Sequence, residues 1–224
     1  MRKLPIPFIG AMVRAILREI EQPGTGKTQT RRVLDIACDE PPAIVEDGRI
    51  IAFDESDKPY RWPRTKAAGD RLYVREAHYL TDDGDYERAV YAADSEATRD
   101  HLATVKRLED THAYTDWSRH KRLRPPMHMP RWASRITLIV TDVRVQRLQE
   151  ISEADAIAEG VEHDSDGWRD YQLPATQCCS TARDSFRTLW DNLNAARGCG
   201  WDANPWVAAY TFRPILGNVD TVAP

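Results

Sequence analysis

Apolar side chains recur every three or four residues in several segments of the chain, which is the spacing of one face of a helix. In residues 11–21, AMVRAILREIE, this spacing predicts a helix that ends before Pro23. A second helix is expected to begin after Ser152, a residue type that caps helix N-termini, and to end at Gly160. The run SFRTLWDNLN predicts a third helix, and a more polar one is expected near 96–107.

Other segments have the alternating or β-branched pattern of strands. Residues 136–148, ITLIVTDVRVQRL, are the clearest case, because they are rich in β-branched side chains and alternate in their second half. Further strands are predicted for RLYVREAHYL after the turn at Gly69, for a short stretch near 89–92, and for WVAAYTFRPI after the Asn-Pro turn at 204.

Long polar segments separate the predicted strands, at about 38–68, 81–125 and 161–180. Few strands, short helices and large insertions favour a small β-barrel with flanking helices in the α+β class over alternating βαβ units. We expect a single domain over residues 1–215, followed by a flexible tail at 216–224.

Charge is balanced over the whole chain and uneven along it. The 224 residues hold 31 Lys and Arg and 35 Asp and Glu, a net charge of −4, which excludes a basic coat over the whole surface. Residues 81–116 nevertheless carry ten acids and four bases, whereas 119–135, RHKRLRPPMHMPRWASR, carry six bases and no acid. A local basic patch therefore remains open.

Cysteine and histidine spacing indicates neither a metal site nor disulfides. The four cysteines form no C-x-x-C pair, and the six histidines show no H-E-x-x-H spacing. Apolar runs fall short of the ~20 residues of a membrane helix, and no signal-peptide cleavage site follows the N-terminal apolar stretch. We expect a cytoplasmic protein with free thiols, no metal, no cofactor and no membrane contact; the sequence does not indicate an oligomeric state.

The densest group of chemistry-bearing residues follows the first predicted helix. GTGKT at 24–28 suggests a phosphate-binding P-loop, but that motif needs a glycine where this chain has Glu21. The longer run KTQTRR places one ammonium, two hydroxyls and two guanidinium groups within six residues. Composition alone favours a solvated edge strand, in which such charges block aggregation. A reactive turn is the alternative.

Several segments, taken together and in order, resemble a known family: MVRAIL, GKTQTRR, GDRLYVRE, HMPRWASRITLIVTDVRVQRLQEISEADAIAEGV, LWDNLN and WDANPWV. They cover about half the chain and are similar to the phage and prophage branch of the ASCH domains, in the PUA-like superfamily. The resemblance implies a small PUA-like β-barrel, a bacterial or phage-encoded origin, and a modified pyrimidine nucleoside or nucleic acid as partner. The turn at 18–26 and the three polar segments are longer than in minimal members.

Minimal bacterial members similar to this chain hydrolyse N4-acetylcytidine to cytidine. The resemblance implies that Lys27 and Thr30, spaced K-x-x-T, and Glu159, in EADAIAEG, are the catalytic residues here. Amide hydrolysis needs a nucleophile, a base and donors for the developing oxyanion. Thr30 would be the nucleophile, Lys27 the base once its pKa falls from about 10.4, and Glu159 the relay that protonates the leaving amine.

Spacing leaves two alternatives open at this site. In a regular strand residues i and i+3 point to opposite faces, so Lys27 and Thr30 meet only at an irregular turn. Thr28, which shares a face with Thr30, is the competing hydroxyl. Glu159 comes just before a helix stop, where an ordinary exposed acid is equally expected.

Candidate substrate-binding residues come from three segments: Arg31, Arg75, Glu76, Arg131 and Trp132. Arg31 also lies where its charge would lower the pKa of Lys27. Arg75 and Glu76 form either an ion pair at the barrel mouth or a contact to a base edge or phosphate. Trp132, flanked by arginines, either closes the barrel end or stacks on a base.

Three functions therefore remain in competition. The first is an amidohydrolase that removes an N4-acyl group from a cytosine-type nucleoside, and the negative net charge favours a small substrate over a polymer. The second is a non-catalytic reader of RNA or modified DNA that uses the basic segment 119–135. The third is a metal-independent ribonuclease, in which Lys27 and neighbouring arginines stabilise a phosphorane.

Overall fold

The computed structural model describes residues 1–34, 43–45, 49–53, 59–61, 65–82, 87–111, 118–173 and 178–222. The α-helices are α1 (Gly10–Glu21), α2 (Ser95–Thr111), α3 (Ser118–Lys121), α4 (Glu153–Ala158) and α5 (Ala182–Asn194). The 3-10 helices are η2 (Pro126–His128), η3 (Arg131–Ala133), η4 (Leu148–Glu150), η5 (Ala195–Arg197) and η6 (Trp201–Ala203).

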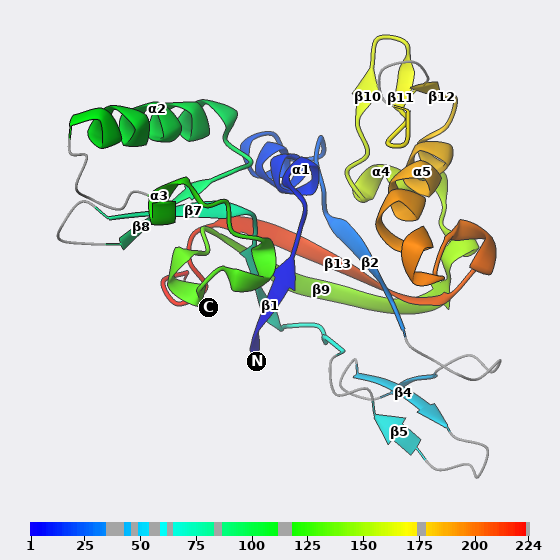
Figure 1. The fold of residues 1–224 in the computed structure, drawn as a ribbon. Helices are drawn as coiled ribbons and strands as arrows, with labels where there is room; N and C mark the ends of the chain where they lie inside the picture. The colour runs from blue at the N-terminus through cyan, green and yellow to red at the C-terminus, as the bar shows by residue number, and fades with distance from the viewer. Residues whose placement is uncertain are drawn as a thin grey trace. The chain divides into compact units, whose positions relative to one another are not determined.

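The strands are shown with the helices in Figure 1. They are β1 (Lys3–Pro7), β2 (Gln29–Val33), β3 (Ala43–Val45), β4 (Arg49–Phe53), β5 (Pro59–Arg61), β6 (Arg71–Arg75), β7 (His78–Asp82), β8 (Glu87–Tyr91), β9 (Ile136–Arg147), β10 (His163–Asp164), β11 (Gly167–Arg169), β12 (Cys178–Cys179) and β13 (Trp206–Leu216). Most of the predicted polar segment 38–68, together with Cys38 and His112, lies outside the described residues.

Contacts along the chain define two compact units. Unit 1 is formed by Met1–Arg2, Ala15–Asp70 and Ile139–Pro214. Unit 2 is formed by Lys3–Arg14, Arg71–Leu138 and Ile215–Pro224. The long strands β9 and β13 contribute residues to both units.

Five strands share one hydrogen-bonded sheet in the order β1-β6-β9-β13-β2. β1 is parallel to β6, with Lys3 opposite Arg71, and β2 is antiparallel to β13, with Thr30 opposite Tyr210. β1 and β2 stand at the ends of this order, so the described strands make an open sheet. The α+β class is therefore confirmed, while the predicted closure into a barrel is not seen in the described part of the chain.

Unit 1 has a helical core of aromatic side chains. Thr181 caps α5 by accepting the N–H of Asp184 at 3.1 Å, as expected for a threonine before a helix. Phe186 on α5 lies 5.9 Å from Trp190 and 6.4 Å from Trp201 between ring centroids, and all three rings are buried. Figure 1 shows β10, β11 and β12 beside α5. Trp190 and Trp201 therefore pack in the core of unit 1.

Unit 2 divides the predicted strand RLYVREAHYL into two. β6 ends at Arg75 and β7 begins at His78, and the two strands belong to different sheets. β7 pairs with β8 as a hairpin, and α2 and α3 flank it (Figure 1). The predicted polar helix is present as α2, which buries only His101 and Val105.

Two terminal segments differ from the sequence-based expectation. Residues 3–7 form β1, a strand that the pattern does not predict because Pro5 and Pro7 lack the N–H of a regular ladder; an edge position accommodates them. The C-terminal segment is packed in unit 2: Val219 is fully buried, and the Asn218 side chain donates to the carbonyl oxygen of Ser134 at 2.8 Å.

Helix α4 follows its sequence signals. Ser152 accepts the N–H of Asp155 at 3.1 Å, and Gly160 has a φ of +82°, the left-handed conformation that ends a helix. Cys178, Cys179 and Cys199 are free. None of the helices that the structure describes is both long enough and apolar enough to cross a membrane.

A glycine allows α1 to approach the turn that precedes β2. The Gly26 N–H donates to the Glu19 carboxylate at 2.9 Å, and the next residue, Lys27, donates its N–H to the carbonyl of Ala15 at 3.0 Å. A Cβ at Gly26 would lie 2.2 Å from that same carbonyl oxygen.

We therefore predict that Gly26→Ala lowers the free energy of unfolding by about 3 kcal/mol, because backbone atoms of α1 cannot move aside. Gly24→Ala is the matched control: it has a positive φ of +88° but open space around a Cβ, so only backbone strain of about 1–2 kcal/mol is expected. Urea denaturation measures both values. Equal losses in the two variants would contradict a close approach at Gly26.

Candidate functional site

Backbone hydrogen bonds in unit 1 bring Lys27 and Glu159 together. Thr28 follows Lys27 and donates its N–H to the carbonyl of Ala158 at 2.9 Å, which ties the turn before β2 to the last residue of α4. Glu159 is the C-cap residue of that helix and donates its own N–H to Asp155 at 2.9 Å. Both functional side chains therefore start from fixed backbone positions.

The carboxylate of Glu159 is buried between two cations. Lys27 Nζ donates to Glu159 Oε2 at 2.7 Å and to the Glu159 backbone carbonyl at 2.6 Å. Arg31 NH1 donates to the other carboxylate oxygen, Oε1, at 3.0 Å. The three residues are 1%, 3% and 4% exposed in the order Lys27, Glu159, Arg31, so water screens these charges weakly. The alternative of an ordinary exposed helix-end acid at Glu159 is wrong.

A second carboxylate completes the charge balance around Arg31. Asp155 lies 3.2 Å from Arg31 NH2 and accepts hydrogen bonds from Gln29 Nε2 at 3.0 Å and Arg144 NH2 at 2.9 Å. Burial acts to raise the pKa of Asp155, but these hydrogen bonds and the charge of Arg31 outweigh it and lower the pKa. Arg31 thus stays neutralised by two carboxylates.

Burial lowers the pKa of Lys27 below its usual value of 10.5. The charge and hydrogen bond of Glu159 act in the opposite direction, and Arg32 and Arg31 add to the lowering. Because desolvation disfavours the ammonium, Lys27 releases its proton more readily than a lysine in water.

Thr30 lies on the other side of β2 from Arg31. Successive residues of a strand point to opposite faces, and the Gln29 side chain donates to Thr211 Oγ1 at 3.3 Å, which identifies the face of Gln29 and Arg31. Thr30 therefore shares the opposite face with its register partner Tyr210. Lys27 precedes β2, so strand alternation does not fix the direction of its side chain.

The face of Thr30 carries two residues that the sequence does not single out. Lys66 Nζ lies 4.9 Å from the centroid of the Tyr210 ring, and the Lys66 N–H approaches the Tyr210 hydroxyl oxygen at 3.5 Å. Burial lowers the pKa of Lys66 to about 8; Arg32 and Arg2 add to this effect and Asp70 opposes it. No sequence signal identifies Lys66, because only the strand register brings Tyr210 next to Thr30.

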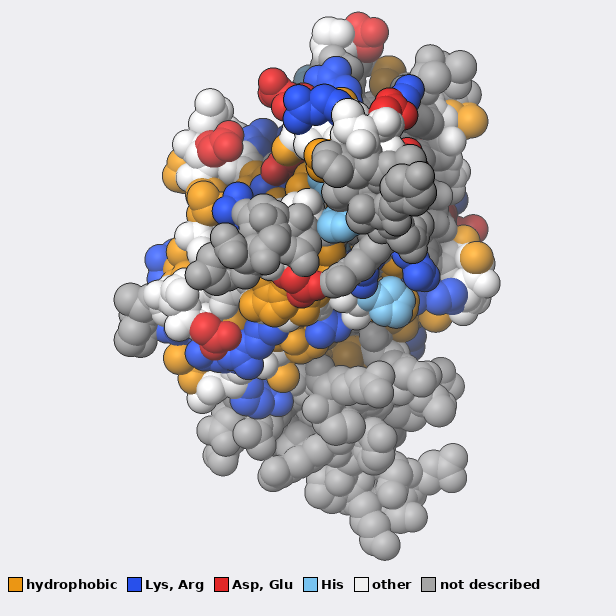
Figure 2. Space-filling view, turned by 60° about the vertical axis from the view of Figure 1, so that its left-hand side comes forward, with side chains coloured by type: hydrophobic (Ala, Val, Ile, Leu, Met, Phe, Trp, Pro, Cys, Tyr) orange, Lys and Arg blue, Asp and Glu red, His pale blue; other side chains and the backbone are white. Residues whose placement is uncertain are grey.

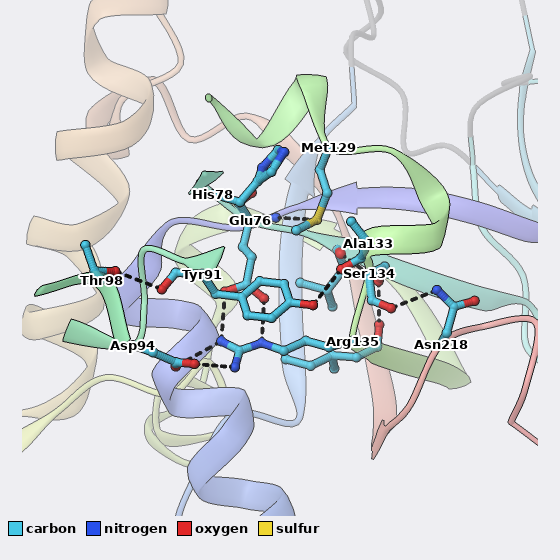
Figure 3. Close-up of polar contacts among 12 residues, drawn as sticks. Glu76, His78, Tyr91, Asp94, Thr98, Met129, Ala133, Ser134, Arg135 and Asn218 are labelled. Carbon is cyan, nitrogen blue, oxygen red and sulfur yellow. Dashed lines mark hydrogen bonds and ion pairs between the residues drawn. The ribbon is translucent and has the colours of Figure 1, made fainter. Parts of the chain in front are cut away.

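Unit 2 holds the other predicted binding residues, and it assigns Glu76 a different partner. Glu76 is buried and accepts two hydrogen bonds from Arg135, from Nε at 2.9 Å and from NH2 at 3.1 Å (Figure 3). Of the two alternatives for Arg75 and Glu76, the ion pair between them is therefore wrong. Burial raises the pKa of the Glu76 carboxyl, although Arg135 acts to lower it.

Arg135 is the centre of this group, and the sequence shows it only as one of six bases. Its guanidinium also donates to both Asp94 oxygens, at 2.6 and 3.0 Å, and lies 3.9 Å from the centroid of the Tyr91 ring. The Tyr91 hydroxyl donates to the Ala133 carbonyl at 2.9 Å (Figure 3). With two carboxylates and a ring as partners, Arg135 holds unit 2 together and is not placed to bind a ligand.

Arg75 and Arg131 meet at one aromatic ring. Their guanidinium carbons lie 5.4 Å and 5.8 Å from the centroid of the Tyr73 ring. Trp132 is 47% exposed, so it does not close the end of a barrel, and Met127 beside Arg75 is 69% exposed. The face drawn in Figure 2 shows basic side chains next to hydrophobic ones.

The buried Glu159 cluster gives a testable stability prediction. Glu159→Gln leaves the Lys27 charge without its carboxylate and should lower the free energy of unfolding by about 3–5 kcal/mol. Adding Lys27→Met removes the uncompensated charge, so the double variant should recover part of this loss. Chemical denaturation measures the free energy of unfolding of the single and the double variant, and their difference gives the part that Lys27→Met recovers.

Asp220→Asn is the matched control, because Asp220 also accepts from a lysine and an arginine, Lys3 and Arg131, but is half exposed. Its denaturation midpoint should not change, since water screens an exposed pair. If the denaturation midpoint of Glu159→Gln is also unchanged, the buried ion pairs of Glu159 with Lys27 and Arg31 contribute no more to stability than the exposed pairs of Asp220.

Comparison of the chain with protein-family models, with curated proteins and with solved structures finds no match. The site in unit 1 consists of Lys27, Glu159 and Arg31, which bind one another, and of Thr30, Tyr210 and Lys66 on the face of β2 opposite Arg31.

Proposed function

We propose that this chain is a metal-independent amidohydrolase that removes an N4-acyl group from a cytosine-type nucleoside. The observation that carries the proposal is the buried contact of 2.7 Å between Lys27 Nζ and Glu159 Oε2, with burial lowering the pKa of the lysine. A lysine with a lowered pKa can accept a proton at a pH where ordinary lysines are already charged.

The proposed reaction moves one proton along this contact. Lys27 takes the proton of the Thr30 hydroxyl through a bridging water as the oxygen attacks the acyl carbon, because Thr30 lies on the face of β2 opposite Arg31 and Lys27 binds Glu159 beside Arg31. The bond from the acyl carbon to N4 breaks, its electron pair stays on nitrogen, and the proton reaches N4 through Lys27 and Glu159. Water then hydrolyses the Thr30 ester, which releases the carboxylic acid and restores the hydroxyl.

The second cation at Glu159 supports this assignment. When Lys27 becomes neutral, a buried carboxylate that had only one partner would be left uncompensated, at a cost of several kcal/mol. Arg31 holds the other oxygen of Glu159 at 3.0 Å, so the carboxylate keeps a counter-charge through the change. Arg31 is thus a positioning residue for Glu159.

The relationship to the PUA-like ASCH domains belongs to the same proposal. It is supported by the order of the shared segments, by the α+β class and by the proximity of Lys27 to Glu159, two residues that lie 132 positions apart in the sequence. A cytoplasmic site of action and a small modified nucleoside as partner follow from the same proposal.

Binding of single-stranded nucleic acid is the second candidate function. It is favoured by the residues Arg75, Met127, Arg131 and Trp132 of unit 2. Two guanidinium groups meet at the Tyr73 ring, and the exposed Trp132 follows one of these arginines in the sequence. Aromatic faces stack on bases, and arginines hold phosphates.

The first candidate predicts that the purified protein converts N4-acetylcytidine to cytidine, followed by chromatography. Lys27→Met should lower turnover by about 10²–10⁴-fold, because it removes the base. Thr30→Val should abolish turnover, whereas Thr30→Ser, which keeps a hydroxyl, should retain part of it. Lys106→Met, at an exposed lysine of α2, is the control with unchanged turnover. Full activity of folded Lys27→Met would refute the assignment.

The second candidate predicts salt-sensitive binding of a labelled single-stranded RNA, measured by fluorescence anisotropy. Trp132→Ala should weaken binding by about 5–100-fold, the contribution of one stacked base. Arg131→Ala should weaken binding and reduce its salt dependence. Arg99→Ala, at an exposed position of α2, is the matched control. Affinity that is the same in all three variants would exclude this surface as the RNA site.

A further inference from the structure

Strand register places a phenol beside Thr30. Thr30 and Tyr210 are directly opposite in the antiparallel pair of β2 and β13, so their Cβ atoms lie on the same face about 4.5–5.5 Å apart. Tyr210 is 2% exposed and Thr30 is 4% exposed. Thr30 and Tyr210 are therefore buried neighbours on the face where an acyl carbonyl attacked by the Thr30 oxygen would lie.

The Tyr210 hydroxyl carries a proton that it can donate. Its described hydrogen bond is one in which the Lys66 N–H donates to the phenol oxygen at 3.5 Å. No acceptor among the described residues takes the phenol proton. Burial raises the pKa of Tyr210, so the phenol keeps this proton at neutral pH. It can form a hydrogen bond to a ligand oxygen without becoming charged.

Lys66 supplies a positive charge next to this phenol. Its Nζ lies 4.9 Å from the Tyr210 ring centroid, and the side chain is half-buried. Within the described part of the chain no carboxylate forms an ion pair with it. The charged and titratable groups around Lys66 are Arg2, Arg32, Asp70 and Tyr210, and Asp70 is itself held by Arg2.

We propose that Tyr210 and Lys66 stabilise the oxyanion that forms when Thr30 attacks the acyl carbonyl, an inference that rests on the proposed amidohydrolase function. In this step the carbonyl π electrons move onto oxygen. Tyr210 donates a hydrogen bond to that oxygen and keeps its proton, and the Lys66 ammonium stabilises the charge. The electrons return when the bond to N4 breaks.

In this proposal two groups of residues have different roles. Lys27, Glu159 and Arg31 transfer the proton. Tyr210 and Lys66, on the face of Thr30, stabilise the negative charge. Fixed donors aimed at a developing oxyanion accelerate acyl transfer because they need no reorganisation at the moment of reaction. Burial of Tyr210 and partial burial of Lys66 strengthen both interactions.

The test is a kinetic comparison of Tyr210→Phe with the wild type on N4-acetylcytidine. Tyr210→Phe keeps the ring and its contact with Lys66 but removes the donor, so kcat should fall by about 10²–10³-fold while KM changes little. Tyr171→Phe is the matched control, because the Tyr171 hydroxyl also accepts a backbone N–H, from Glu162 at 3.1 Å. Its kcat should equal that of the wild type.

The pH profile tests Lys66 separately. Because Lys66 loses its proton near pH 8, wild-type kcat should decline above about pH 8. Lys66→Met should have a lower kcat at pH 7 and lack this decline, and Lys66→Arg, which stays charged, should recover activity at pH 9.

The outcomes separate the two proposals. If the wild type turns over, Lys27→Met does not, and folded Tyr210→Phe keeps the wild-type kcat, the oxyanion role fails and the proposed function stands. If the wild type produces no cytidine from N4-acetylcytidine, the proposed function and this inference fail together. A loss of kcat in Tyr171→Phe equal to that in Tyr210→Phe would also overturn the inference, since a buried phenol would then act only through packing.

Discussion

The burial of the Glu159 carboxylate between two cations is the constraint on which the site in unit 1 depends. A carboxylate that is 3% exposed needs close counter-charges, and Lys27 and Arg31 supply one to each of its oxygens. This requirement ties the turn before β2 to the end of α4, and the backbone bonds of Lys27 and Thr28 reinforce the tie. Fold and candidate chemistry thus rest on the same contacts.

Strand alternation then gives the site two distinct environments. On one face of β2, Arg31 and Gln29 bind the carboxylates of α4 and of its C-cap. On the other face, Thr30 lies beside Tyr210, over whose ring Lys66 is placed. A single strand therefore separates the charge-compensated groups, to which we assign proton transfer, from the phenol and the lysine, to which we assign stabilisation of the oxyanion. In unit 2, by contrast, Arg135 donates hydrogen bonds to Glu76 and Asp94 and thereby holds that unit together.

Local sequence signals predict the elements better than their partners. The helical spacing of 11–21, the cap at Ser152 and the β-branched run at 136–148 each correspond to an observed element, because these signals act within a few residues. β1 is not predictable in this way, since its two prolines suit only an edge position. The pairing of Lys27 with Glu159 is expected only from the family resemblance. The proposed roles of Lys66 and Tyr210, and the ion pairs of Arg135, depend on register and long-range packing, which no local pattern encodes.

Burial makes Lys27 give up its proton more readily than a lysine in water, even though it is paired with Glu159. NMR of protein labelled at the lysine side chains, with Lys27→Met to assign the signal, measures the pKa of this amine directly. We expect Lys27 to titrate below the usual value of 10.5. A Lys27 that stays charged to pH 10.5 or above would contradict this expectation, because attraction to Glu159 would then outweigh desolvation and leave no base at the site.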